Sequence, residues 1–137
     1  REMAEYGHQY ASQTVANAKA FGQALADEGV NVEAEEFGFT ESHQLALNVT
    51  NFGDAKTIAR SLAEQNNIIT NYNLLPGDKD PNNPSGLRIG VQEMTRYGMK
   101  ETDMQELAAL MKAGLEGKVV KDQVVQLRSR FTEVHYA

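Results

Sequence analysis

A long helical pattern opens this sequence, and short strand-like runs follow it. Over residues 6–28, side chains suited to a buried face recur at spacings of four and three: Tyr10, Thr14, Ala18, Phe21 and Leu25. That spacing places them on one side of a helix. A helix with one such face needs a surface to cover. We therefore expect the later strands to form a sheet that this helix packs on.

Four short runs have the composition of β-strands. The clearest is 44–50, where Leu45, Leu47 and Val49 alternate with other residues, as in a strand with one buried face. Further strands are predicted at 30–33, 68–70 and 86–91, with a hairpin connection at 35–39. Pairing between such short runs gives a small, mainly antiparallel sheet covered by helices, which is an α/β fold of the α+β type.

Three more helices are expected after the first. One begins at Asp54, a suitable N-cap, and ends at 66–67. The segment 102–105, Thr-Asp-Met-Gln, has the form of a capping box for a helix that Gly117 ends. The last helix is predicted at 118–132. All three prolines fall in the loop 72–85, and a loop of this length is usually functional or disordered.

Composition excludes several classes of protein. A length of 137 residues suits one domain, so residues 1–137 are expected to form a single domain. Thirteen Lys and Arg against 19 Asp and Glu leave a net charge of -6, which argues against nucleic acid as a partner. No apolar run approaches the roughly 20 residues that span a membrane. The absence of cysteine excludes disulfides and thiolate metal sites. We expect a cytoplasmic domain.

Arg88 is the residue with the clearest chemical meaning. It lies in an apolar strand between Leu87 and Ile89, with Gly86 and Gly90 on either side. A guanidinium in such a strand must bind an anion or reach solvent, because a buried unpaired charge is very costly. Its planar fork of donors suits a carboxylate, and the glycines would let a ligand or another backbone approach closely. The alternative is a surface arginine with an ion-pair partner.

Other candidate groups are weaker. His43 precedes a predicted strand and is more simply a structural hydrogen-bonding group than a catalyst. His8 and His135 are too isolated in the sequence to suggest a metal site. No glycine-rich phosphate loop or nucleophile elbow is present. The residues by themselves therefore predict a small domain with one notable arginine and do not define a reaction.

Several segments together resemble the serine hydroxymethyltransferase family. Residues 67–76 read Asn-Ile-Ile-Thr-Asn-Tyr-Asn-Leu-Leu-Pro, and after the proline-containing loop residues 85–90 read Ser-Gly-Leu-Arg-Ile-Gly. The family has a similar Asn-x-Asn-x-x-Pro segment, followed at a similar distance by Ser-Gly-x-Arg. Residues 15–20, 40–43 and 95–101 are similar to further family segments in the same order. The likeness covers nearly the whole chain.

The resemblance implies a fold and an activity. In the family, this region is the smaller C-terminal domain of a fold-type I pyridoxal-phosphate enzyme, which interconverts serine and glycine with one-carbon transfer to a pterin. The cofactor lysine lies in the larger domain, upstream of residue 1. This chain would then carry no catalytic residue and no cofactor lysine, and it would be inactive by itself. Its partners would be its own N-terminal domain and, in the intact protein, a second copy in a homodimer or higher homo-oligomer.

The resemblance also assigns roles to two residues. Arg88 matches the arginine that binds the α-carboxylate of the amino acid, glycine or serine. Asn73 matches the asparagine that lines the pterin site, which takes tetrahydrofolate or a modified pterin. The segment 90–93, Gly-Val-Gln-Glu, resembles archaeal-type members, where many others have Gly-Thr-Pro-Ala.

One departure keeps other functions open. The loop segment 81–84, Pro-Asn-Asn-Pro, lacks the Ser-Pro-Phe that is common in the family. One alternative is a pterin-independent β-hydroxy-amino-acid aldolase or transaldolase of the same fold. Another is a stand-alone ligand-binding or interaction domain.

Overall fold

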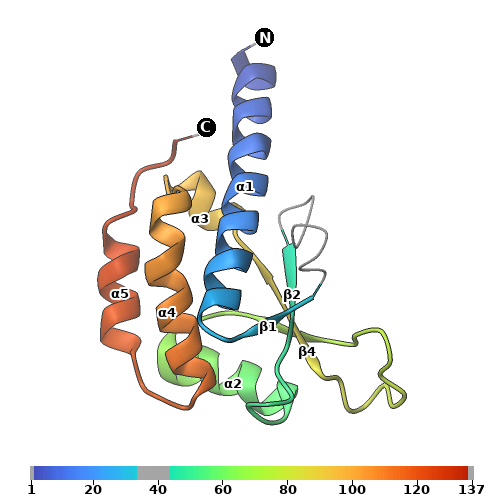
Figure 1. The fold of residues 1–137 in the computed structure, drawn as a ribbon. Coiled ribbons are helices and arrows are strands. Elements are labelled where there is room, and N and C mark those ends of the chain that lie inside the picture. Colours follow the sequence, from blue (N-terminus) through green and yellow to red (C-terminus); the bar gives the residue numbers. More distant parts are fainter. Residues whose placement is uncertain (1, 34–43, 136–137) are drawn as a thin grey trace.

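The computed structural model of the protein describes residues 2–33 and 44–135 (Figure 1). Its elements are α1 (Glu2–Asp27), β1 (Asn31–Val32), β2 (Gln44–Asn48), α2 (Ala55–Asn66), β3 (Asn71–Asn73), β4 (Gly86–Gly90), α3 (Gln92–Arg96), the 3-10 turn η2 (Glu101–Asp103), α4 (Met104–Leu115) and α5 (Lys121–Ser129). The hairpin connection expected at 35–39 and the side chain of His43 lie outside the described residues.

The four strands form an antiparallel sheet in the order β1-β2-β4-β3. In its middle, Leu87 of β4 pairs with Leu47 of β2 on one side and with Tyr72 of β3 on the other. Burial alternates along β2 and β4, as the pattern of leucines predicts. The expected small antiparallel sheet covered by helices is confirmed.

The helices cover one face of this sheet. In Figure 1, α1, α4 and α5 lie side by side, and α2 packs below α4 and α5. The largest fully buried apolar side chains come from both layers: Leu25, Leu47, Leu62, Leu87, Met99 and Met104. Burial of one such side chain contributes about 1.5–3 kcal/mol, so this interface between helices and sheet is the main source of stability.

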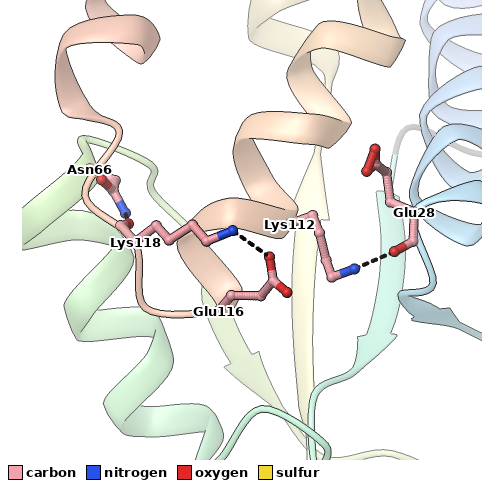
Figure 2. A network of polar contacts seen from close by, with 5 residues as sticks. All are labelled: Glu28, Asn66, Lys112, Glu116 and Lys118. Carbon is pink, nitrogen blue, oxygen red and sulfur yellow. Dashed lines mark hydrogen bonds and ion pairs between the residues drawn. The ribbon is translucent and has the colours of Figure 1, made fainter.

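Polar contacts tie the ends of three helices together (Figure 2). The ammonium of Lys112 in α4 donates to the carbonyl oxygen of Glu28, just beyond the C-terminal end of α1. A cation there complements the partial negative charge of the helix end. Past the end of α4, the Lys118 ammonium lies 3.4 Å from the Glu116 carboxylate. The Lys118 carbonyl accepts a hydrogen bond from Asn66 of α2 at 3.0 Å.

The strand predicted at 68–70 is wrong, because the chain pairs with β4 three residues later, at Asn71–Asn73. Asn67 adopts the left-handed conformation with φ of 57°, and the Ile68 N–H donates to the Leu62 carbonyl at 3.0 Å. This turn ends α2, and the next residues have no strand partner. The edge strand β3 therefore occupies the beginning of the segment that was expected to be a loop.

Two helices begin differently from the prediction. The Val120 N–H donates to the buried Asn66 side chain at 2.6 Å, and α5 starts only after it, at 121 instead of 118. At α4, the Lys100 N–H donates to the Asp103 carboxylate at 2.8 Å, which caps the 3-10 turn η2. The capping box predicted at Thr102 does not form: Thr102 is exposed within η2, and Asp103 precedes α4 without a side-chain hydrogen bond to that helix.

Candidate functional site

The sheet face that points away from the helices is polar. Strand register places nine residues on it, here called the open face: Asn31, Gln44, Ala46, Asn48, Asn71, Asn73, Gly86, Arg88 and Gly90. They alternate with the buried leucines and isoleucine of the same strands, and cross-strand partners share a face of a sheet. An antiparallel sheet with one packed and one polar face presents the polar face to solvent or to a partner.

Arg88 stands in the central strand of the open face. Its cross-strand neighbours are Ala46 of β2 and Asn71 of β3. The side chain is exposed, and no hydrogen bond or ion pair joins it to any residue in the described part of the chain. The alternative reading of Arg88, a surface arginine with an ion-pair partner, therefore has no support among these residues. Within the described residues, the donors of the guanidinium have no acceptor.

The space over the two glycines beside Arg88 is occupied by other parts of the chain, and at Gly86 these include the backbone of β3, one of the two close approaches expected there. A Cβ atom at Gly86 would lie 2.6 Å from Cγ of Leu75 and 3.0 Å from the backbone oxygen of Asn73, and one at Gly90 would collide with Oε1 of Gln92. Side chains of the same chain therefore approach the backbone where a ligand was expected to do so. Leu75 forms an apolar wall on one side of Arg88, and the Gln92 carboxamide forms a polar wall on the other.

Asn73 lies on the same face as Arg88. It pairs with Gly86, two residues before Arg88, and its side chain is half-buried. Diagonal neighbours in an antiparallel pair have their Cβ atoms about 7–8 Å apart. The structure thus brings both residues singled out from the sequence to one surface, at a separation that a small polar ligand can bridge.

Asp78 organises the loop between β3 and β4. Its carboxylate accepts hydrogen bonds from the Leu75 N–H at 2.8 Å, from the Ser85 hydroxyl at 2.7 Å and from the Ser85 N–H at 3.0 Å. These donors, the Leu75 N–H first, hold the pKa of the Asp78 carboxyl below its ordinary value. Because Asp78 links the two ends of the loop, it holds Leu75 over Gly86.

The segment after β4 is anchored to α1. The Tyr10 hydroxyl donates to the Gln92 carbonyl at 2.8 Å, and the Thr95 hydroxyl donates to the Val91 carbonyl at 2.7 Å. Burial raises the pKa of the Tyr10 hydroxyl, and the Glu93 carboxylate raises it further. These contacts stabilise α3, a single turn of helix that the sequence pattern did not predict, and they fix the main chain from which Gln92 reaches over Gly90.

Comparison with known proteins identifies the family. The model of the family described as serine hydroxymethyltransferase matches residues 2–111. The chain belongs to this family. A serine hydroxymethyltransferase of Methanobrevibacter smithii is 50% identical over 99% of the chain, and one of Saccharolobus islandicus is 50% identical over 98%. The match covers 33% and 32% of these archaeal proteins, so the chain spans about a third of the length of these relatives.

A solved structure supports the fold. The crystal structure of L-threonine transaldolase from Pseudomonas fluorescens, in its internal aldimine state, superposes with a TM-score of 0.84. The two sequences are 31% identical, and the match covers 99% of this chain and 32% of the other. The expected resemblance to serine hydroxymethyltransferases, and to their archaeal members in particular, is confirmed.

Sequence reasoning missed two neighbours of Arg88 in this family member. Asn71 was assigned no role because the strand was predicted at 68–70. Gln92 was assigned no role because the helix α3 was not predicted. The signal for Asn71 was present: in Asn-Tyr-Asn the asparagines alternate with period two, which puts 71 and 73 on one face of a strand. No comparable local pattern indicated that Gln92 lies over Gly90.

The open face does not fit pyridoxal phosphate as a group anchored by this chain alone. The cofactor is held through a lysine amine, and none of the nine residues of the open face is a lysine. Among residues 2–33 and 44–135, no cluster of His, Asp or Glu could hold a metal ion. None of the helices in the described part of the chain has the length and apolar character needed to cross a bilayer.

Proposed function

We propose that this chain is the C-terminal domain of a pyridoxal-phosphate-dependent, serine hydroxymethyltransferase-like enzyme and that Arg88 binds the α-carboxylate of glycine or serine. The observation that carries the proposal is the exposed Arg88 guanidinium, without a partner among the described residues, on the polar face of the sheet. The chain belongs to the family and matches about a third of the length of its curated relatives. Both findings support the assignment as a domain of a longer protein.

Arg88 performs a positioning role in this proposal. Two parallel N–H donors of the guanidinium bind both oxygens of a carboxylate and fix its plane as well as its position. A fixed carboxylate fixes the amino acid, so the bond to be broken keeps one orientation during the reaction. Pyridoxal phosphate is expected from the rest of the protein, where it supplies the electron sink. The rigid strand β4, paired on both sides, holds Arg88 in place.

Asn73 is proposed to line the site of the second substrate, tetrahydrofolate or a modified pterin. Its amide lies on the same face as Arg88 and offers both a donor and an acceptor. The structural likeness to an L-threonine transaldolase favours a second candidate, a pterin-independent aldolase or transaldolase of β-hydroxy amino acids. For Asn73→Ala in the intact protein, the first candidate predicts a raised KM for the pterin. In the second, activity needs no pterin.

The remaining proposals concern the assembly of the intact protein. We expect the open face to pack against the preceding pyridoxal-phosphate domain, and the intact enzyme to form a homodimer in the cytoplasm. A polar sheet face that carries an uncommitted arginine suits a site shared between two domains. Size-exclusion chromatography with light scattering on the intact protein tests the dimer directly.

The test of the proposal is Arg88→Lys in the intact protein. Lysine keeps the charge but loses the two parallel hydrogen bonds, a loss of about 2–4 kcal/mol or roughly 30- to 1000-fold in kcat/KM for the amino acid. The melting temperature should stay unchanged because the side chain is exposed. Arg60→Lys, an exposed arginine on α2, is the matched control and should keep full activity. An Arg88→Lys variant that melts early but retains normal specific activity would contradict the proposed role.

A further inference from the structure

Arg88 and Asn71 are direct neighbours on adjacent strands. The two residues are register partners in the antiparallel pair β3–β4, which places their Cβ atoms about 4.5–5.5 Å apart on the same face. Both side chains are exposed, and neither hydrogen-bonds to another residue in the described part of the chain. A carboxamide oxygen thus stands beside a guanidinium with uncommitted donors.

The other neighbours of Arg88 among the described residues are poorer hydrogen-bond acceptors for its guanidinium, or lie farther along the strand. Ala46, its neighbour on β2, has only a methyl group. Leu75 covers Gly86 with hydrocarbon. The Gln92 carboxamide lies over Gly90, two residues along the strand and so about 7 Å away, at the end of a longer and more flexible side chain. Among the described residues, Asn71 is therefore the polar register partner of Arg88, and its side chain is short with few rotamers.

A bound carboxylate leaves part of the guanidinium unsatisfied. Arginine has five N–H donors, and a bidentate carboxylate takes two of them. When a ligand and a second domain cover the open face, the remaining donors lose water, and each donor without a partner then costs free energy. A neighbouring acceptor removes part of that cost and fixes the plane of the guanidinium.

We propose that Asn71 is a positioning residue for Arg88: its carboxamide oxygen accepts a hydrogen bond from the guanidinium while the guanidinium holds the carboxylate of the amino acid. The inference rests on the proposed function of Arg88 and adds a residue to it. Asn71 does not touch the ligand in this arrangement. Its effect on binding passes entirely through the orientation of Arg88.

A double-mutant cycle in the intact protein tests the inference. Asn71→Ala should raise KM for the amino acid roughly tenfold, with an unchanged melting temperature and a smaller change in kcat. In the Arg88→Lys background the same substitution should change KM less than twofold, because an ammonium has no plane to orient. Asn51→Ala is the matched control, since Asn51 is an exposed asparagine in the turn after β2 and does not belong to the open face. It should leave KM unchanged in both backgrounds.

Asn71→Asp provides a second variant of nearly the same shape. Its carboxylate competes with the substrate for Arg88, so KM should rise more than in Asn71→Ala. An unchanged KM in both Asn71 variants, with a raised KM in Arg88→Lys, overturns the role of Asn71 and leaves that of Arg88 intact. An undiminished effect of Asn71→Ala in the Arg88→Lys background also overturns it, because Asn71 would then act independently of Arg88. An unchanged KM in Arg88→Lys overturns the proposed function itself.

Discussion

The carboxamide of Asn17 in α1 donates to the hydroxyl of Thr95 in α3 at 2.8 Å, and both side chains are completely buried. The same nitrogen also donates to the Met99 carbonyl at 2.8 Å, and the Thr95 hydroxyl donates a hydrogen bond to the Val91 carbonyl at 2.7 Å. This chain of hydrogen bonds joins the first helix to the residue that follows β4. The position of the strand that carries Arg88 is thereby coupled to α1 through Asn17 and Thr95, which lie 78 residues apart in the sequence.

Replacing Thr95 with valine tests this connection. Valine has the same shape, but it leaves one Asn17 amide proton without its acceptor in a buried place, while the Val91 carbonyl keeps the backbone N–H of residue 95 as a donor. We expect the free energy of unfolding to fall by about 1–3 kcal/mol, measured by urea denaturation. Thr102→Val, at an exposed threonine, is the control and should change stability by less than about 0.5 kcal/mol. Equal effects in the two variants would mean that the buried hydroxyl contributes nothing.

Asn66 connects α2 to the segment between α4 and α5, and we predict that this connection contributes to the free energy of unfolding. Its side chain donates to the Lys118 carbonyl and accepts from the Val120 N–H, and it is 1% exposed. Asn66→Ala leaves both backbone groups unpaired, at a cost of about 1–3 kcal/mol each. We expect a loss of roughly 2–4 kcal/mol in the free energy of unfolding. The exposed neighbour serves as control: Gln65→Ala should be nearly neutral, and a similar loss there would mean that the loss in Asn66→Ala does not come from its two hydrogen bonds.

The loop held by Asp78 is predicted to loosen in acid. The folded-state pKa of this carboxyl lies below the unfolded value of about 3.9, so its stabilising contribution is complete above that value. The contribution is lost as the pH falls through the lower, folded-state pKa. Hydrogen exchange at the amides of Leu75 and Ser85, corrected for its intrinsic pH dependence, should therefore lose protection in that range.

Asp78→Asn is the matched variant for this prediction. Asparagine keeps the shape of the side chain but has no carboxyl proton to gain and one acceptor fewer. The variant should show weaker protection of Leu75 and Ser85 at neutral pH, without the additional loss in acid. Retention of the acid-dependent loss in Asp78→Asn would assign it to another group.

The isolated chain is predicted to fold but to be inactive. The buried side chains of the helices and strands form one hydrophobic cluster, so we expect a single cooperative unfolding transition by circular dichroism. Added pyridoxal phosphate should keep the absorbance spectrum of the free cofactor, because the open face carries no lysine, and serine should not be turned over. A new absorbance band that disappears when one lysine of this chain is replaced would contradict the assignment as a domain without the cofactor lysine.

The sequence alone determined that β2 has one buried face, and it singled out Arg88 as the candidate functional residue of β4. The apolar residues Leu45, Leu47 and Val49 at every second position predicted the buried side of β2, and the structure confirms it. Leu87 and Ile89, on either side of Arg88, are buried in the same way in β4. This was possible because period two is a local property of an extended backbone. The same alternation, with the Ser-Gly-x-Arg motif, singled out Arg88 before any contact was known.

Only the tertiary structure decided what surrounds Arg88. The position of β3 depends on the left-handed turn at Asn67 and on pairing with β4, and a shift of one residue would have put Asn71 on the opposite face. Likewise, Gly86 and Gly90 give no sign in the sequence that Leu75 and Gln92 cover them. These covers come from a loop and a helical turn whose positions are set by hydrogen bonds to other segments. Contacts between segments are not encoded in the local periodicity of either one.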